Sequence, residues 1–413
     1  MPKILIVTTV PETVAVILRE QPRFLRQHYD VEVVTSPGDA CRTIADSEGV
    51  RVHALHMERG ISVLRDGLSV LSMIRVLRRA RPDLVHSYTP KAGLVAMLAG
   101  WSCRVPVRVH TFTGLIFPSS RGLRQQLLIW ADRLICACAT HVVPEGNGVR
   151  HDLQRYRITS KPLQVIGFGN IAGIDTAHFS RTAAGVEEAA RQLRARLGIG
   201  DDAFVFCFIG RLNRDKGLPE LAAAFAGMPA RCHLLLVGGL DAIAPPDACT
   251  LRALRAHPRV HEIGFVDDVR PALRASDVLV LPSYREGFPN VMLQAGAMTL
   301  PVVASDINGC NEVIETGQNG WLVPPRDTDA LTGAMQQAEQ AGAVVRDRMG
   351  EAARRRIATR FERREHWERL RAFYRGLLQE RSAAGQPEPA ASALTAESAE
   401  TEEAPQAGIS ARR

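Results

Sequence analysis

The sequence lacks any long hydrophobic run and any ordered series of cysteines. No stretch reaches the about 18 uninterrupted apolar residues of a membrane span. The apolar run Ile4–Val7 is also too short for a secretory signal. The eight cysteines are scattered, and Cys136 and Cys138 form CxC rather than the CxxC typical of zinc sites. We therefore expect reduced thiols, no zinc site and a cytoplasmic location.

Two ligand-binding signatures are also missing, whereas positive charge is plentiful in one half of the chain. The phosphate loop GxxxxGK[ST] does not occur, and no nucleic-acid recognition motif is visible. The net charge is +7, and residues 1–175 hold 22 Lys and Arg against 14 Asp and Glu. This favours an anionic partner such as a phosphate group or an acidic membrane surface, although a generally arginine-rich composition would look the same.

Short apolar runs alternate with helical patterns, which indicates βαβ units and parallel sheets. Because 413 residues exceed what one hydrophobic core usually serves, two domains are expected. We predict an α/β protein with two Rossmann-like, doubly wound domains that face a cleft, at 1–175 and 176–360. A C-terminal helix at 361–380 should follow. Residues 381–413 are rich in Ala, Ser, Glu and Pro and are predicted to be disordered.

Twelve strands are predicted, six in each domain. Those of the first domain are Ile4–Val7, Val31–Thr35, Val52–Leu55, Leu84–Ser87, Val107–His110 and His141–Val143. Those of the second are Phe204–Ile209, Leu234–Val237, Arg259–Glu262, Val278–Leu281, Pro301–Ala304 and Trp321–Val323. The predicted helices include Val14–Gln27, Leu68–Ala80, Ala92–Trp101, Leu123–Cys138, Leu218–Phe225, Val291–Met298 and Ala330–Gln340. Ligands of such sheets bind outside the carboxyl ends of the strands, so functional motifs should follow strands.

The first such motif is FVFCFIGRLNRDKGL, residues Phe204–Leu218. Gly210 permits a sharp turn after the strand, Arg211 follows, and Lys216 opens a helix. Two cations and a helix N-terminus suit a diphosphate, whereas a solvated basic loop is the plainer alternative. Further along, Gly238 and Gly239 end a strand. The residues assigned to the same nucleotide pocket are Gly210, Gly238, Gly239, Phe265 and Val266.

The most informative segment is Ser283–Val303, in which Glu286 follows a strand and leads into a helix expected near residue 290. Glu286 can accept hydrogen bonds from sugar hydroxyl groups. Gln294 comes eight residues later, which would place both side chains on one helical face. The other residues assigned to donor binding here are Gly287, Phe288, Pro289 and Asn290.

The order GRLNRDKG, VGG, EGFPN and GQNGWLVPPRD resembles the family-four retaining glycosyltransferases of the GT-B fold. The resemblance covers roughly residues 1–375. The stretches HSYTPKAG and HTFTGLIF look like those of bacterial enzymes that build surface polysaccharides or lipid-linked glycans.

This resemblance implies a nucleotide-sugar donor, a UDP-sugar by preference, and a polyprenyl-diphosphate-linked glycan as acceptor. It implies that Arg211 and Lys216 bind the donor diphosphate, that Glu286 contacts the donor sugar, and that His110 lies near the leaving group. The family's ribose-binding Glu is Gln294 here, which weakens that contact by roughly 1 kcal/mol.

The acceptor side is assigned to Thr9 and Lys91, each of which follows a strand of the first domain. The resemblance implies retention at the anomeric carbon by front-face displacement, with no metal and no other cofactor. Asp327-Thr328-Asp329 is formally a DxD motif, but its position after two prolines favours a helix cap.

Helix 123–138 combines apolar residues with Arg121, Arg124 and Arg133, and predicts contact with the cytoplasmic face of the inner membrane. An ordinary core-packing helix is the alternative. For the whole protein, a nucleotide-sugar epimerase and a non-catalytic sugar-nucleotide-binding subunit also remain open.

Overall fold

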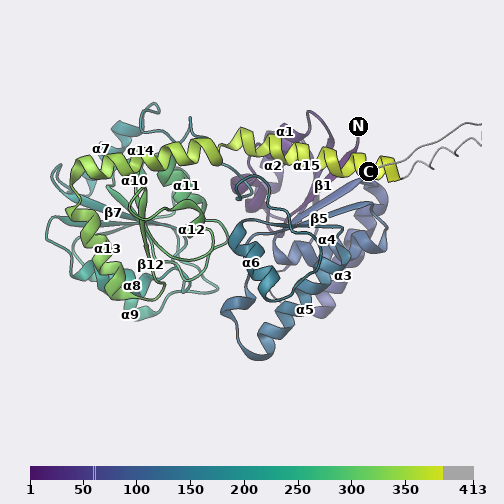
Figure 1. Cartoon of the computed structure of the whole chain (residues 1–413), viewed down its shortest axis with the longest axis horizontal. Coiled ribbons are helices and arrows are strands. Elements are labelled where there is room, and N and C mark those ends of the chain that lie inside the picture. Colours follow the sequence, from purple (N-terminus) through teal and green to yellow (C-terminus); the bar gives the residue numbers. More distant parts are fainter. Residues whose placement is uncertain (59, 61, 385–413) are drawn as a thin grey trace, which may run out of the picture.

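A computed structural model shows two lobes, each built around one parallel sheet of six strands (Figure 1). The structure describes residues 1–58, 60 and 62–384. The strand orders are β3-β2-β1-β4-β5-β6 in the first domain and β12-β11-β10-β7-β8-β9 in the second. Each order runs outward in both directions from a central pair of strands, which is the doubly wound arrangement. The predicted pair of α/β domains is confirmed.

All twelve predicted strands are present, with small shifts at their ends. The first sheet contains β1 (Lys3–Val7), β2 (Asp30–Thr35), β3 (Arg51–Ala54), β4 (Leu84–Tyr88), β5 (Val107–Phe112) and β6 (His141–Pro144). The second contains β7 (Phe204–Ile209), β8 (Cys232–Val237), β9 (Val260–Gly264), β10 (Val278–Leu281), β11 (Val302–Ser305) and β12 (Gly320–Val323). Every residue of β7 and β10 is buried, as expected for strands covered on both faces.

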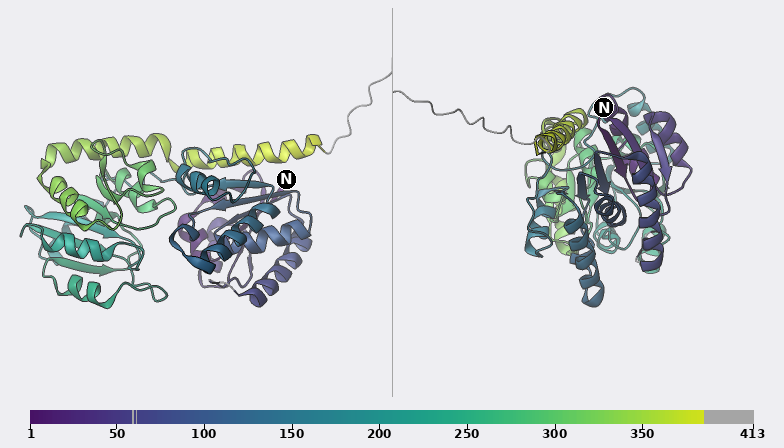
Figure 2. Two further views of the ribbon diagram at one scale, coloured as in Figure 1. Left: turned by 60° about the horizontal axis from the view of Figure 1, so that its bottom comes forward. Right: turned by 90° about the vertical axis from the view of Figure 1, so that its right-hand side faces the viewer.

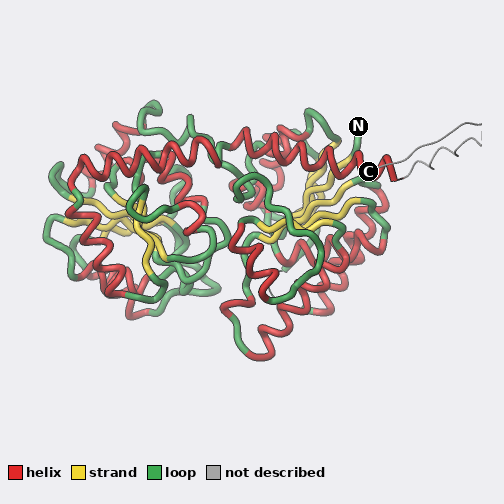
Figure 3. The backbone as a smooth tube through the Cα atoms, in the orientation of Figure 1, coloured by secondary structure: helices red, strands yellow, loops and turns green. Residues whose placement is uncertain are grey.

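Helices surround the strands in each lobe (Figure 3). The first domain has η1 (Thr13–Ile17), α1 (Gln21–Leu25), α2 (Ala40–Glu48), α3 (Val63–Ala80), α4 (Pro90–Ser102), η2 (Phe117–Ser119), α5 (Gly122–Cys138) and α6 (Asn147–Arg155). The second has α7 (Val186–Arg196), α8 (Leu218–Ala226), α9 (Ala248–Ala256), α10 (Arg270–Arg274), α11 (Asn290–Ala297), α12 (Cys310–Val313), α13 (Thr328–Gln340) and α14 (Gly342–Arg360). The last helix is α15 (Arg363–Ala384).

The predicted helix Val14–Gln27 is wrong as a single element. The chain forms the short π-helical turn η1, breaks at Glu20 with φ at 67°, and resumes as α1. Pro22 stands in the first turn of α1, where its missing N–H does no harm, but it could not sit inside a continuous helix. The periodicity of apolar residues was correct, and the proline divides it.

Helix α15 leaves the second domain and packs against the first (Figures 1 and 2). Its apolar face enters the first domain's core through Trp367, Leu370, Tyr374 and Leu377. The predicted C-terminal helix is therefore present, and it extends to Ala384. Of the segment 381–413 that was predicted to be disordered, residues 385–413 lie outside the described residues.

Candidate active site

Lys216 and Glu286, predicted from separate motifs, meet at the carboxyl edge of the second sheet. Lys216 Nζ lies 2.5 Å from Glu286 Oε1, and the two side chains are 18% and 13% exposed. Gly217 makes this approach achievable, because a Cβ there would lie 1.9 Å from the carbonyl oxygen of Pro282. Gly217 also takes the left-handed conformation, with φ at 65°, as it begins α8. The loop after β7 is thereby packed onto the loop after β10.

Arg211 lies at the same edge but points to a different carboxylate. Its guanidinium donates to Asp241 Oδ2 at 2.9 Å, and the Arg211 side chain is 64% exposed. Gly238 allows the ends of β7 and β8 to close together, because a Cβ there would lie 2.0 Å from the carbonyl oxygen of Gly210. A cation with this exposure can turn toward a bound anion.

Phe265 and Val266 follow β9 and lie beside Gly239, just after the end of β8. Phe265 is 77% exposed, and its Cβ would be 3.9 Å from a Cβ on Gly239. Val266 packs against the core of the second domain. An exposed aromatic ring next to a backbone without side chains provides a stacking surface for a planar group.

The helix expected after Glu286 begins at Asn290, with Pro289 just before it. Glu286 therefore lies in the turn that precedes the helix, and the prediction that Glu286 and Gln294 share a helical face is wrong. Gln294 occupies the second turn of α11 and is partly buried. Phe288 is 5% exposed and contacts Phe361, so it anchors the turn that carries Glu286.

His110 is fully buried in β5 and keeps one nitrogen free for a further partner. Its Nδ1 lies 2.9 Å from Ser87 Oγ, while its buried Nε2 has no hydrogen-bond partner among the described residues. Burial lowers the pKa of His110 to about 3, so the imidazole is neutral at physiological pH. Gly93 makes room for the ring, because a Cβ there would lie 2.4 Å from His110 Cε1. A buried, unpartnered imidazole nitrogen is unusual and favours a role toward a ligand.

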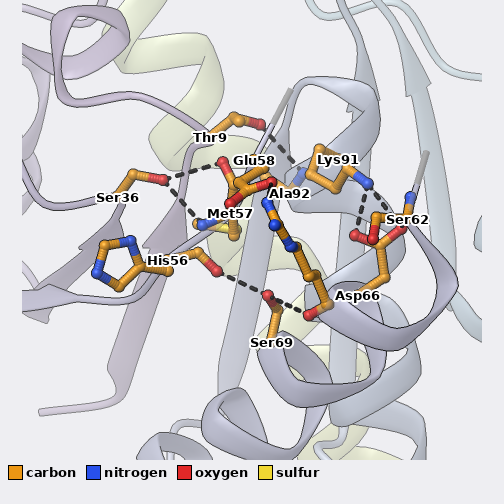
Figure 4. A network of polar contacts seen from close by, with 11 residues as sticks. Thr9, Ser36, His56, Met57, Glu58, Ser62, Asp66, Ser69, Lys91 and Ala92 are labelled. Atoms are coloured by element: carbon orange, nitrogen blue, oxygen red, sulfur yellow. Dashed lines mark hydrogen bonds and ion pairs between the residues drawn. The ribbon is translucent and has the colours of Figure 1, made fainter. Parts of the chain in front are cut away.

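Thr9 and Lys91, assigned to the acceptor side, lie together in a polar network (Figure 4). Lys91 Nζ contacts both oxygens of Asp66, at 2.6 and 2.7 Å, and both side chains are nearly buried. This ion pair links α4 to α3. Lys91 is therefore not the free cation that was predicted to bind an acceptor phosphate. Thr9 bonds to Thr89, whose φ of 74° is rare for a β-branched residue.

The two domains touch beside Glu286. A Cβ on Gly114, after β5, would lie 3.0 Å from the Cα of Gly287. A Cβ on Gly287 would in turn lie 2.7 Å from the carbonyl oxygen of Thr113 and 2.5 Å from Oε2 of Glu145. The backbone of the Glu286 turn therefore lies directly against the carboxyl edge of the first sheet.

Sequence reasoning missed several residues that join the domains. Glu312 accepts hydrogen bonds from the first backbone N–H groups of α6, those of Asn147 and Gly148. Asn170 donates to Asn290 at 2.7 Å. The partners of these residues are distant in the chain, so no local pattern reveals them. For Glu145 the one available signal was its position just after a predicted strand.

Two other expectations concern metals and membranes. Asp327 caps α13 by accepting from the backbone N–H of Ala330 at 2.8 Å, as its context predicted. Within the described ranges no three or more His, Cys, Asp or Glu side chains are placed so that they could hold a metal ion together. In those same ranges no helix has both the length and the apolar character to traverse a bilayer.

Two facing Rossmann-like domains with a helix that crosses back define the GT-B class. The chain belongs to the glycosyltransferase group 1 family. The model described as "Glycosyl transferases group 1" matches residues 203–340, and the "Glycosyl transferase 4-like domain" matches residues 13–169. The predicted family and the GT-B fold are thereby confirmed, and the protein is a glycosyltransferase.

Several known proteins resemble the chain over most of its length. The capsular polysaccharide biosynthesis glycosyltransferase CapM of Staphylococcus aureus is 28% identical, covering 92% of this chain and 98% of CapM. An Escherichia coli UDP-Gal:alpha-D-GlcNAc-diphosphoundecaprenol alpha-1,3-galactosyltransferase is 27% identical, covering 67% of this chain and 71% of that enzyme. The structure of Anabaena HepE in complex with UDP-glucose aligns with a TM-score of 0.76 at 19% identity, over 91% of this chain and all of HepE.

Proposed function

We propose that the protein transfers a sugar from a UDP-sugar to a lipid-diphosphate-linked glycan during synthesis of a bacterial surface polysaccharide. The contact between Lys216 and Glu286 carries this proposal, because it places a cation for the donor diphosphate beside an acceptor for sugar hydroxyl groups. CapM and the Escherichia coli enzyme, by their names, act in polysaccharide synthesis and on a diphosphoundecaprenol acceptor.

Each part of the donor has a chemically suitable partner in this arrangement. The N-terminus of α8, Lys216 and Arg211 can stabilise negative charge on a departing diphosphate. The exposed ring of Phe265 suits the nucleobase, and Gln294 on α11 suits the ribose. These groups would suffice to stabilise the leaving group, so the proposed reaction needs no metal ion.

Retention at the anomeric carbon is part of the proposal. The acceptor hydroxyl would approach from the side on which the diphosphate leaves, so that the diphosphate can take up its proton. We assign His110 to this point, where its neutral ring could donate or accept one hydrogen bond through Nε2 without adding charge.

We propose that the acceptor side faces a membrane surface. Helices α3, α4 and α5 pack side by side and carry the exposed apolar residues Leu64, Leu68, Leu71, Trp101, Leu123, Leu127, Trp130 and Leu134. Arginines flank the apolar residues of α5, among them Arg121, Arg124 and Arg133. An apolar face with a basic border suits an anionic leaflet, where a lipid-linked acceptor would reside.

A donor screen tests the proposal. Purified protein is incubated with a panel of UDP- and GDP-sugars, a membrane extract supplies the acceptor, and released nucleotide is measured with and without EDTA. We expect nucleotide release with one UDP-sugar, dependent on acceptor and insensitive to EDTA. The anomeric configuration of the product, measured by NMR, tests retention.

The same screen separates the two alternatives. A nucleotide-sugar epimerase would convert donor without acceptor, and a non-catalytic subunit would bind donor without turnover. Either result would overturn the proposal. No observation in the structure favours either alternative.

A further inference from the structure

Glu145 is a buried carboxyl group that the proposed reaction leaves unused. It directly follows β6 and is 6% exposed. Its backbone N–H donates to Phe112 at 3.0 Å, and its carbonyl oxygen accepts from Asn170 at 2.8 Å. These two hydrogen bonds fix the Glu145 backbone between the first sheet and the segment around Asn170 that leads to the second domain. The position from which its side chain extends is therefore fixed.

The Glu145 carboxyl group occupies the space that a side chain at position 287 would need. A Cβ on Gly287 would lie 2.5 Å from Glu145 Oε2. Gly287 separates Glu286, which contacts the donor sugar in the proposed function, from the buried anchor Phe288. Glu145, in the first domain, therefore packs against the turn of the second domain that orients Glu286.

Two other carboxyl groups, those of Glu286 and Glu312, lie near enough to Glu145 to interact with its charge, and both have compensating partners. Glu286 is paired with Lys216, and Glu312 accepts two N–H groups at the start of α6. Within the described residues, Glu145 has no ion pair. Burial raises the pKa of Glu145 well above its ordinary range, and the nearby charges of Glu286 and Glu312 raise it further.

Among the described residues that line the other side of Glu145, none carries a positive charge at physiological pH. Glu145 lines a water-sized cavity that is also bordered by His86 of β4 and His366 of α15. Burial lowers the pKa of His86 well below its ordinary value and that of His366 to about 4, so both rings are neutral at physiological pH. Among the described residues no cation pairs with Glu145, so burial and the neighbouring carboxylates both disfavour a negative charge there.

We propose that Glu145 acts as an uncharged carboxylic acid and is a positioning residue that holds the Glu286–Phe288 turn against the first domain. This inference rests on the proposed function. The neutral acid can donate a hydrogen bond and packs closely on the Gly287 backbone. When ionised, it adds a negative charge beside two existing carboxylates and favours separation of the domains.

The sign of the pH dependence follows from the raised pKa. When the domains separate, water reaches Glu145 and its pKa falls toward the ordinary value. The separated form then releases a proton that the closed form retains, so closure weakens as pH rises from the ordinary glutamate range up to the raised pKa. Glu145→Gln keeps the shape and neutrality of the acid and should remove this dependence.

Small-angle X-ray scattering of the full chain tests the conformational part. Profiles are recorded without ligand from about pH 5.5 to about pH 9 for the wild type, Glu145→Gln and Glu339→Gln. Glu339 is a matched control, because it is 5% exposed and pairs with Arg231 away from the cleft. We expect the radius of gyration to rise with pH in the wild type and the control but to stay constant in Glu145→Gln. Identical profiles for wild type and Glu145→Gln would overturn the proposal.

Steady-state kinetics with the donor and acceptor identified in the screen test the positioning part. Glu145→Ala should raise the donor KM by about 10-fold or more, whereas Glu145→Gln should stay within about threefold of the wild type and lose activity less steeply at alkaline pH. Thermal melting of both variants monitors folding. If Glu145→Gln raises the donor KM as much as Glu145→Ala does, and the two variants are equally stable to heat, the proposal is wrong. If the wild type transfers no sugar, the proposed function fails, and the scattering result still decides whether Glu145 controls closure.

Discussion

Lys216 forms an ion pair with Glu286, and a bound diphosphate would compete with Glu286 for the Lys216 ammonium group. We predict that Lys216→Ala lowers kcat/KM for transfer at least about 100-fold, which corresponds to about 2.7 kcal/mol of lost transition-state stabilisation. The same loss is expected for Arg211→Ala, because its exposed guanidinium can leave Asp241 for the donor. Nucleotide release under initial-rate conditions measures both effects.

Lys3→Ala is the matched control for Lys216→Ala. Lys3 also forms ion pairs, with Asp30 and Glu32, but it lies at the start of β1. Its removal should leave kcat/KM unchanged. Near-normal turnover in Lys216→Ala or Arg211→Ala would show that the corresponding cation does not bind the diphosphate.

Gly93 is expected to tolerate no side chain, since His110 occupies the space. Gly93→Ala should lower the free energy of unfolding by about 1–3 kcal/mol, because α4 or the imidazole must move. Gly333→Ala is the control. It lies inside α13 with nothing within 4 Å of its Cβ, and should gain about 1 kcal/mol. Chemical denaturation measures both, and equal stability changes would show that the His110 contact imposes no constraint.

The sequence placed Lys216 and Glu286 of the second domain at strand ends that the structure brings together, whereas it gave no sign of the ion pair that holds Lys91 in the first domain. The pairing of Lys216 with Glu286 follows from local motifs at neighbouring strand ends. The pairing of Lys91 with Asp66 could not be predicted, because it depends on how α3 packs against α4. Glu145 carries no local signature, because its contact with Gly287 joins segments that are far apart in the chain.

Helix α15 is held by contacts with residues that are distant in sequence. The buried hydroxyl group of Tyr374 lies 2.6 Å from His86 Nδ1, and His86 Nε2 lies 2.6 Å from Thr111. Tyr374→Phe should lower the free energy of unfolding by about 1–3 kcal/mol, because a buried ring nitrogen loses its partner. Urea denaturation measures this change.

A double-mutant cycle isolates the contribution of that hydrogen bond. If Tyr374 acts through His86, Tyr374→Phe should cost far less when His86→Phe is already present. Equal costs in both backgrounds would assign the effect to packing of the Tyr374 ring instead.

Strands were easier to predict than helices for a physical reason. Strands buried on both faces are continuous apolar runs, so β7 and β10 stand out from their surroundings. Helices on the surface carry mixed residues, and α7 and α14 were missed because each is rich in charge. The predicted helix Val14–Gln27 had the apolar periodicity of one helix, but Pro22 begins a second one.

At the scale of the molecule, the exposed apolar residues of α5 predict binding to anionic vesicles. Leu123 is 90% exposed and Trp130 is 65% exposed. Leu123→Ser and Trp130→Ser should each weaken co-sedimentation with phosphatidylglycerol vesicles by about 10-fold, through lost apolar burial. High salt should weaken the wild type as well, because the flanking arginines contribute by charge.

Ile243→Ser and Val344→Ser are the controls for vesicle binding. These residues are 73% and 84% exposed, but they lie on the second domain. Neither change should affect co-sedimentation. Equal losses from both domains would indicate non-specific adsorption and would remove the support for a membrane-facing α5.

Because α15 completes the core of the first domain, a fragment ending at residue 175 would leave that core open. The end of α15 returns to the beginning of the chain: Arg381 and the backbone N–H of Lys3 both bond to Asp83. A circularly permuted gene that places residues 363–384 ahead of residue 1 through a short linker would therefore restore the missing wall. Such a rearranged chain would let the first domain, and its proposed contact with the acceptor, be studied alone.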